Sequence, residues 1–295
     1  MSNEFDAFWN HERAVPAEAV VGKFNEQEVA AFRADMDRDV LEESRGIYRD
    51  AVDSDLMRSF GNAETPLYSA DAVVLTDDPD KLISEVSQEN MILAQAMADI
   101  VEEATSEVVV LSPYFVPGDA GVEFWRSIVA KGVRVVIITN SLAANNHTAV
   151  HSGYSKYRKD VIRAGVELYE ARANAVSDPG KGGTKAKTMT MHTKAMIFDR
   201  ERLFVGSLNL DPRSIEINSE MGMVVTSAEM SGNLADRLFE GLGDWTYRVK
   251  LNEDGRLRWH ATIDGVEVVE TSEPLASGWR KFSAWFLKIA PERQL

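Results

Sequence analysis

Six residues stand at fixed spacing between Met191 and Val225, and their chemistry suits the binding of one small anion. They read H-x-K-x4-D-x6-G-S-x-N and are His192, Lys194, Asp199, Gly206, Ser207 and Asn209. A neutral imidazole is a nucleophile or proton carrier near neutral pH, and an ammonium group is a compact cation with three donors. A hydroxyl and an amide follow on a glycine bend, where backbone can approach a ligand closely. The pattern predicts that four donors converge on one phosphate-like group.

The elements that position these residues are predicted to be strands. Residues 191–198 alternate as a strand does, which places His192 and Lys194 on the same face. After a turn, a short strand over residues 203–206 returns the chain toward them. This strand would deliver the hydroxyl and the amide to the same place.

Glu220 lies on a further predicted strand, residues 217–225. We expect its carboxylate to reach back to His192 and fix the tautomer of the imidazole, as the third member of a triad does. Each residue of the motif also has a purely structural explanation when taken singly. G-S-x-N is a common turn, and N-L-D-P can cap a helical turn before Arg213.

Composition narrows the range of functions. The chain has 295 residues, of which 44% are hydrophobic, so it can bury one large core or two modest ones. It has no cysteine, which excludes disulfides and thiolate metal sites. Its five histidines show no metal-ligand spacing. We therefore predict that it needs neither a metal nor a cofactor.

The net charge of −15 is unevenly placed along the chain. Residues 1–103 hold 24 acidic and 8 basic residues, whereas the remainder holds 23 acidic and 24 basic residues. A protein that binds nucleic acid normally presents a basic track to the phosphate backbone. This distribution disfavours nucleic acid as a partner.

The chain has features of a peripheral membrane protein. No apolar run approaches the length of about 18 residues that a membrane span needs, and the N-terminus lacks a secretion signal. Near the C-terminus, apolar residues at helical spacing stand among bases: Trp279, Arg280, Lys281, Phe282, Trp285, Phe286, Lys288, Ile289 and Arg293. This composition suits a helix in an anionic membrane interface, and a helix that docks onto the domain is the alternative.

Strands and helices are predicted to alternate before the motif. Predicted strands cover residues 67–75, 108–111, 133–139 and 166–170. Predicted helices cover residues 25–58, 78–105, 118–131, 149–164 and 228–242, and residues 256–270 form a hairpin that turns at Asp264-Gly265. Residues 174–188 form a polar loop whose lysines, Lys181, Lys185 and Lys187, could meet an anionic headgroup. The fold class is α/β, with a mixed sheet between helix layers.

The motif resembles the HKD signature of the phospholipase D superfamily. Four flanking stretches are similar to the second half of bacterial cardiolipin synthases and related phospholipase D-like proteins: residues 112–117, 139–143, 151–158 and 165–170. The resemblance implies the family's α-β-α sandwich with a mixed central sheet. It divides the chain into an acidic, mainly helical segment, residues 1–105, and an HKD domain, residues 106–295, that ends in a hairpin and an amphipathic helix.

The same resemblance implies a mechanism for the motif. His192 would attack a lipid phosphodiester and form a phosphohistidine intermediate. Lys194, Ser207 and Asn209 would hold the phosphoryl oxygens and stabilise the developing charge. Glu220 would orient His192.

Other residues carry over in supporting roles. Asp199 matches a member of the motif that is a structural partner in the family rather than a group that reacts. Gly206 and Tyr114 match positions around the substrate, as does His151.

Members of this group ordinarily carry two HKD motifs that meet at one active site, whereas no second H-x-K occurs in this sequence. The chain resembles a half-protein, with residues 1–105 as the linker or remnant of a first half. A second half would come from an identical chain or from a separate polypeptide. His151 is a weaker, local source of the second imidazole that general acid-base catalysis needs.

The implied function is phospholipase D-type phosphatidyl transfer on a phosphatidylglycerol-like phospholipid, closest to a cardiolipin synthase. A glycerol hydroxyl as acceptor would give cardiolipin, and water would give phosphatidic acid, so transferase and hydrolase activities both fit. The implied location is the cytoplasmic membrane surface, with an anionic bilayer as partner. The alternatives are a phosphodiesterase or nuclease of the same superfamily and a non-catalytic lipid-binding half-protein.

Overall fold

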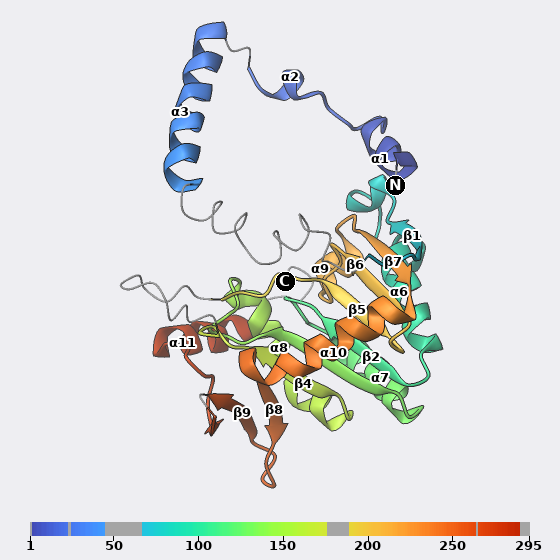
Figure 1. Ribbon diagram of the computed structural model, residues 1–295, viewed down its shortest axis with the longest axis vertical. Helices are drawn as coiled ribbons and strands as arrows, with labels where there is room; N and C mark the ends of the chain where they lie inside the picture. The colour runs from blue at the N-terminus through green and yellow to red at the C-terminus, as the bar shows by residue number, and fades with distance from the viewer. Residues whose placement is uncertain (1, 23–24, 45–66, 176–188, 264, 290–295) are drawn as a thin grey trace. The chain divides into compact units, whose positions relative to one another are not determined.

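The computed structural model describes residues 2–22, 25–44, 67–175, 189–263 and 265–289 (Figure 1). Its contacts divide the chain into two units, Met1–Ser69 and Ala70–Leu295. The described helices of the first unit are α1 (Ser2–Trp9), α2 (Ala17–Val20) and α3 (Glu26–Ser44). The side chains described in these three helices include none that is buried, so they form no core among themselves.

The second unit is built on a sheet whose described strands number ten, in the order β1-β7-β6-β5-β2-β3-β4-β8-β9-β10. Strands β2, β3 and β4 are parallel, and the other neighbouring pairs are antiparallel. The strands are β1 (Asp71–Thr76), β2 (Glu107–Leu111), β3 (Arg134–Asn140), β4 (Glu167–Ala171), β5 (Ala195–Phe198), β6 (Arg202–Gly206), β7 (Met221–Thr226), β8 (Thr246–Leu251), β9 (Leu257–Ile263) and β10 (Val266–Glu270).

Helices cover both faces of this sheet (Figure 1). Those on one face are α6 (Ile92–Glu103), α7 (Gly118–Ala130) and α8 (Thr148–Arg163), and α10 (Ala228–Trp245) packs on the other. Helix α11 (Gly278–Phe286) lies against α8. The short helices are α9 (Pro212–Glu216), η1 (Pro79–Leu82), η2 (Gln88–Asn90) and η3 (Leu287–Ile289). The second unit is therefore the predicted α/β fold, an α-β-α sandwich with a mixed central sheet.

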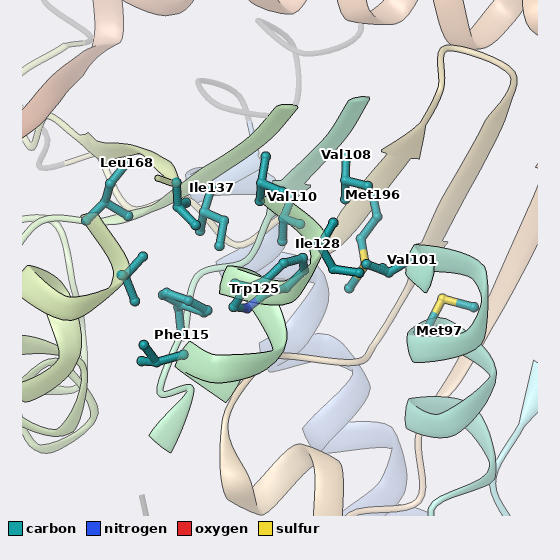
Figure 2. Close-up of a cluster of buried hydrophobic side chains, with 14 of the residues drawn as sticks. Met97, Val101, Val108, Val110, Phe115, Trp125, Ile128, Ile137, Leu168 and Met196 are labelled. Atoms are coloured by element: carbon teal, nitrogen blue, oxygen red, sulfur yellow. The ribbon is translucent and has the colours of Figure 1, made fainter. Parts of the chain in front are cut away.

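The central strands are buried on both faces. In β2, Val108 and Val110 join the core beneath α6 and α7, whereas Val109 faces the side of α10. Figure 2 shows the first of these clusters around Trp125 and Ile128 of α7. Runs of β-branched residues are typical of parallel strands with helices on both sides.

Most of the predicted elements are confirmed. The structure has the strands expected near residues 108–111, 133–139, 166–170 and 203–206, the helices expected near 118–131, 149–164 and 228–242, and the hairpin of β9 and β10. Strand β8 was not expected, and it pairs with the free edge of β4. The predicted loop over residues 174–188 lies largely outside the described residues, as does the second half of the helix predicted over residues 25–58.

Four elements begin later than predicted. Strand β1 begins at Asp71 rather than at residue 67. Helix α6 begins at Ile92 rather than at residue 78, because the carboxylate of Asp77 accepts a hydrogen bond at 2.9 Å from the N–H of Leu93 in the first turn, and the predicted start is the short helix η1. Strand β5 begins at Ala195 rather than at residue 191, because the backbone of Met191 pairs with the side chain of Asn140 instead of a strand. Strand β7 begins at Met221, after a loop.

The structure moves the predicted division of the chain from residue 105 to residue 69. The reason is that residues 70–105 belong to the sandwich. Strand β1 pairs with β7 along its whole length, and α6 contributes Leu93, Met97 and Val101 to the core. Most acidic residues of this stretch lie on the solvent-facing side of the sandwich, so they do not mark a separate segment.

Asp199 ties the start of β2 to the turn between β5 and β6. Its carboxylate accepts hydrogen bonds of 2.8–3.1 Å from the backbone N–H groups of Thr105, Ser106 and Glu107 and from the hydroxyls of Thr105 and Ser106. Burial raises the pKa of this carboxyl, but the backbone N–H groups outweigh it and lower the pKa to about 2. The clamp joins two strands that are far apart in sequence.

We expect Asp199→Asn to lower the free energy of unfolding by about 1–3 kcal/mol at neutral pH, because an amide cannot accept at both of its polar atoms. The folded pKa lies below the ordinary value of 3.8, so the stabilisation is complete above that value and is lost as the pH falls toward about 2. Urea unfolding at neutral pH and at about pH 3 measures both effects.

Asp160→Asn is the matched control, because Asp160 pairs with Arg163 on the surface of α8. Its free energy of unfolding should change by less than about 0.5 kcal/mol. Equal losses in the two variants would contradict the clamp.

Candidate functional site

The residues of the motif meet where β5 begins and β6 ends, beside the C-terminal ends of β2 and β3. The N–H of Gly206 donates to the carbonyl of Lys194 at 3.2 Å, and the N–H of Ser207 donates to the carbonyl of Met221 at 2.8 Å. In open α/β sheets, ligands bind outside the C-terminal ends of the parallel strands. The fold therefore brings three separate segments of the motif to the edge where a ligand is expected.

Asn140, the last residue of β3, positions the backbone directly before His192. Its buried side chain donates from Nδ2 to the carbonyl of Met191 at 2.9 Å and accepts at Oδ1 from the N–H of Met191 at 3.0 Å. The same Nδ2 lies 3.3 Å from the carbonyl oxygen of Pro113. This two-way pairing reproduces the hydrogen bonds of a neighbouring strand. It leaves the side chain of His192 exposed.

Lys194 lies beside His192 and faces two carboxylates. Its Nζ donates to the carbonyl oxygen of His192 at 3.0 Å. Burial lowers the pKa of the Lys194 ammonium group, and the negative charges of Glu220 and Asp211 oppose that shift. A half-buried cation beside an exposed imidazole is suited to binding phosphate oxygens.

A chain of hydrogen bonds connects Asn209 to Glu220. The Nδ2 of Asn209 donates to the hydroxyl of Ser214 at 3.3 Å, and that hydroxyl donates to Oε1 of Glu220 at 2.8 Å. Asn218 donates to the same oxygen at 3.3 Å. Within the described residues, Glu220 makes no hydrogen bond with His192. The contact expected between them is replaced by one that runs through Ser214 to Asn209.

A buried ion pair holds Glu220 and Ser214 from behind. The Nζ of Lys81 lies 2.7 Å from Oδ2 of Asp77, and both side chains are fully buried. That oxygen of Asp77 accepts from the N–H of Glu220 at 3.1 Å, and Lys81 donates to the carbonyl of Ser214 at 3.4 Å. Removing one member of such a pair leaves an uncompensated buried charge. The pair therefore fixes the approach of β7 to α9.

Asp211 caps α9 beside the same network. Its Oδ1 accepts from the N–H of Ser214 at 3.1 Å. Burial raises the pKa of the Asp211 carboxyl to about 6, against the backbone N–H groups of Ser214 and Arg213, and the charge of Glu220 raises it further. A carboxyl group in this range exchanges a proton near neutral pH.

A pocket of about 310 Å³ opens beside Tyr114. The ring of Tyr114 lies edge-on to His192, with a centroid separation of 6.4 Å, and edge-on to His147, with a separation of 5.5 Å. Its hydroxyl donates to Oδ1 of Asn146 at 2.7 Å. Asn209 lines the same pocket. The imidazoles of His147 and His192 therefore both lie against the ring of Tyr114, beside this pocket.

His151 has other partners. Its buried ring lies 2.9 Å from a guanidinium nitrogen of Arg158 and 3.7 Å from the carboxylate of Glu273. The described residues include no contact between His151 and Tyr114. The substrate role predicted for His151 is corrected accordingly, because the ring belongs to a buried ionic cluster. The imidazole beside Tyr114 is that of His147, one helical turn earlier.

Ser207 and Gly206 are held against β7. The hydroxyl of Ser207 accepts from the N–H of Met221 at 3.0 Å and donates to its carbonyl at 3.2 Å. A Cβ added to Gly206 would lie 2.7 Å from both the Cα of Gly222 and the ring of Phe204. Glycine is required here by the close approach of two strands.

Four residues of the arrangement carry less sequence signal than the motif does: Asn140, His147, Asp211 and Ser214. Asn140 ends a predicted parallel strand, which is where ligand sites occur in α/β sheets. Asp211 precedes a proline and has the pattern of a helix cap. Nothing in the sequence distinguishes His147 or Ser214. Asp199, in contrast, belongs to the motif but lies at the other end of β5 from Lys194, away from this group.

No three His, Asp or Glu side chains among the described residues gather closely enough to hold a metal ion. No helix that the structure describes is long and apolar enough to cross a bilayer.

The residues of this site lie within a segment of the chain that matches a known protein family. Residues 97–242 match the family described as "Cardiolipin synthase, PLD-like domain". Cardiolipin synthase C of Escherichia coli (strain K12) is 34% identical over 229 residues, which are 77% of this chain and 48% of that protein. An uncharacterized protein of Helicobacter pylori (strain ATCC 700392 / 26695) is 25% identical and aligns with 99% of this chain and 57% of its own length. The chain thus spans about half the length of these curated relatives.

The solved structure of Nuc from Salmonella typhimurium, a phospholipase D family member, is also similar. It covers 60% of this chain and 99% of its own, with 15% sequence identity and a TM-score of 0.42.

We expect Asn140→Asp to lower the free energy of unfolding by about 2–4 kcal/mol, because a carboxylate oxygen would replace the donor that faces the carbonyls of Met191 and Pro113. Urea unfolding at neutral pH measures this loss. Asn252→Asp is the matched control at an exposed turn: the new carboxylate can still accept from the N–H of Arg256 at 2.8 Å, and only the 3.4 Å hydrogen bond from Nδ2 to Asp254 is lost. Its free energy of unfolding should fall by less than about 1 kcal/mol. If the two variants are equally stable, the side chain of Asn140 does not hold Met191.

Proposed function

The chain belongs to the phospholipase D superfamily, and on that premise we propose that it transfers a phosphatidyl group through a covalent intermediate on His192. Its similarity to proteins named cardiolipin synthase favours a phospholipid substrate such as phosphatidylglycerol. The observation that carries the proposal is geometric. The imidazole of His192 is exposed beside the ammonium group of Lys194, within the matched segment and at the edge of the sheet where ligands bind.

In the first step, a nitrogen of His192 attacks the phosphorus of the lipid. An N–P bond forms, the P–O bond to the leaving alcohol breaks, and the alcohol takes up a proton. Lys194, Ser207 and Asn209 are the donors nearest in sequence and fold to the phosphoryl oxygens, and their hydrogen bonds would strengthen as negative charge develops. In the second step, an acceptor hydroxyl gives up its proton and attacks the phosphorus, and the N–P bond breaks.

Glu220 supports this chemistry through Asn209. Its carboxylate accepts from the hydroxyl of Ser214, which in turn accepts from Asn209. The chain of bonds fixes the rotamer of the Asn209 amide and its direction toward the pocket. We therefore assign Glu220 and Ser214 as positioning residues.

The proton donor and acceptor in these steps must be a second group. One HKD motif supplies one nucleophile, and we propose that the second imidazole comes from an identical chain or from a separate polypeptide, as a symmetric pairing would allow. Within the same chain, His147 is the candidate for the second imidazole, because it and His192 both lie edge-on to the ring of Tyr114.

Nuclease-type phosphodiester hydrolysis is the second candidate. The motif would carry out the same chemistry on either substrate, because in the proposed step His192 and Lys194 contact only the phosphodiester, which lipids and nucleic acids share. The net charge of −15 opposes it, because a polyanionic substrate is repelled.

The substrate class can be decided by direct comparison. We expect the protein to release the headgroup from, or transfer phosphatidyl groups between, molecules of phosphatidylglycerol in mixed micelles, and to leave single-stranded DNA intact. Specific activity across a dilution series should fall if an identical chain completes the site, because the dimer dissociates. Cleavage of DNA without turnover of lipid would reverse the assignment. Constant activity in a monomer would make His147 the proton donor to test.

We expect His192→Ala to abolish the acid-labile phosphoryl label that the substrate leaves on the protein, and to lower kcat by about 10⁴-fold or more. Glu220→Gln should retain the label and lose about tenfold in kcat, because its effect passes through Ser214 and Asn209. His260→Ala, in β9, is the control and should match the unaltered protein. Undiminished labelling of His192→Ala would exclude His192 as the nucleophile.

A further inference from the structure

Helix α11 and the short helix η3 that follows it present a row of exposed aromatic and aliphatic side chains. Trp279 is 75% exposed and Ile289 is 82% exposed, and Phe282, Trp285 and Phe286 between them are each more than half exposed. The opposite side of the helix is attached to the domain, because Ala284 is buried and its carbonyl accepts from the hydroxyl of Ser152 in α8. The helix is therefore docked on one face and uncovered, among the described residues, on the other.

The uncovered residues form one continuous patch, which we call the α11 ridge (Trp279, Phe282, Trp285, Phe286 and Ile289). The ring of Phe282 lies 5.7 Å from that of Trp279, 6.0 Å from that of Trp285 and 6.4 Å from that of Phe286, measured between centroids. Aromatic patches of this kind on a soluble surface mark interaction sites. The rings pack side by side along the helix, so the ridge presents an apolar strip.

A basic cleft adjoins α11, because Lys281 of that helix lines it together with residues of β9. The cleft has a volume of about 680 Å³, and four bases line it: Lys159, Arg256, Arg258 and Lys281. Glu273 is the one acidic residue that lines it, and its carboxylate is engaged by the guanidinium of Arg158 at 2.8 Å. The lining of the cleft therefore carries more positive than negative charge, although the whole chain has a net charge of −15.

We propose that the α11 ridge and the basic cleft form one docking surface for an anionic lipid bilayer. The ridge would enter the interface between headgroups and acyl chains, where tryptophan is favoured. The bases of the cleft would contact the phosphates of anionic headgroups, each contributing to the attraction. The α11 ridge and the basic cleft both include residues of α11. The ridge supplies the apolar contacts and the cleft supplies the positive charge that binding to an anionic bilayer needs.

Two other occupants fit less well. Proteins that bind single-stranded nucleic acid combine basic side chains with separated aromatic rings, on which the nucleobases stack. The rings of Trp279, Phe282 and Trp285 contact each other instead, and Ile289 offers no stacking face. A second copy of this chain would bring two basic clefts together, which like charge opposes.

The surface also has a fixed relation to the site of the motif. The guanidinium of Arg280, in α11, donates to the carbonyl of Asn145, in the loop that leads to His147. Asn146 in that loop accepts from the hydroxyl of Tyr114. Docking through α11 would therefore hold the mouth of the pocket beside the interface. The docking itself does not depend on the proposed chemistry, because it involves none of the residues of the motif.

Binding is tested without turnover, by sedimentation of the full chain with vesicles. We expect it to sediment with an equimolar mixture of phosphatidylcholine and phosphatidylglycerol, and to bind phosphatidylcholine alone at least about tenfold more weakly. Trp279→Ser with Trp285→Ser, and separately Lys159→Glu with Arg256→Glu, should each weaken binding to the mixture by about tenfold or more. Arg126→Glu with Lys131→Glu, in α7, is the control for charge and should bind as the unaltered protein does.

A second measurement distinguishes docking from a change of fold. Lipids brominated in the acyl chain should quench the tryptophan fluorescence of the bound protein, and Trp279→Phe with Trp285→Phe should remove most of that quenching while binding persists. Binding that neither pair of variants weakens would overturn the proposal. So would binding of single-stranded DNA in place of vesicles, or self-association that the ridge variants abolish while vesicle binding is unchanged. Failure of the lipid chemistry proposed above would leave this result intact, and the reverse also holds.

Discussion

The two hydrogen bonds between the side chain of Asn140 and the backbone of Met191 are the constraint on which the site depends. Strand β5 begins only at Ala195, and although Lys194 still accepts from the N–H of Gly206 in β6, Met191 pairs with no strand among the described residues. The amide of Asn140 supplies that pairing from the end of β3, and buries its own polar atoms in doing so. His192 follows immediately and is exposed because its neighbour is anchored. Asn140, a residue outside the motif, therefore positions the nucleophile proposed here.

Charge is arranged in two layers around the motif. The inner layer is the buried pair of Lys81 and Asp77, which satisfies both ions and leaves Asp77 free to accept from the backbone of Glu220 and Leu93. The outer layer, which includes Asp211, faces Lys194. Buried ion pairs contribute little net stability but do specify one arrangement. Here the arrangement specified is the meeting of β7, α6 and α9 behind the pocket.

Sequence reasoning succeeded where one pattern determines one local structure. The apolar runs of β2 and β3 and the periodicity of α7, α8 and α10 predict those elements because burial on known faces leaves few alternatives. It failed where a side chain replaces a backbone partner. The spacing of His192 and Lys194 reads as a strand, yet the bonds that extend this segment come from Asn140, some 50 residues away in sequence. The hydrogen bond from Ser214 to Glu220 escaped prediction for a similar reason, since Ser214 leaves no periodic signal.

The close approach of β6 and β7 at Gly206 has a consequence for how this protein can change through evolution. Gly206 and Gly222 are paired across the two strands, and the ring of Phe204 covers the space that a side chain on either would need. A larger residue at Gly222 is compatible with the fold only if Phe204 becomes smaller, so the effects of these two substitutions are not additive. At Gly206 the backbone of β7 also blocks a side chain, because an added Cβ would lie 2.5 Å from the carbonyl oxygen of Met221. In aligned homologues Phe204 and Gly222 should vary together, whereas Gly206 should not vary. Single substitutions alone would make this region look more intolerant of variation than it is.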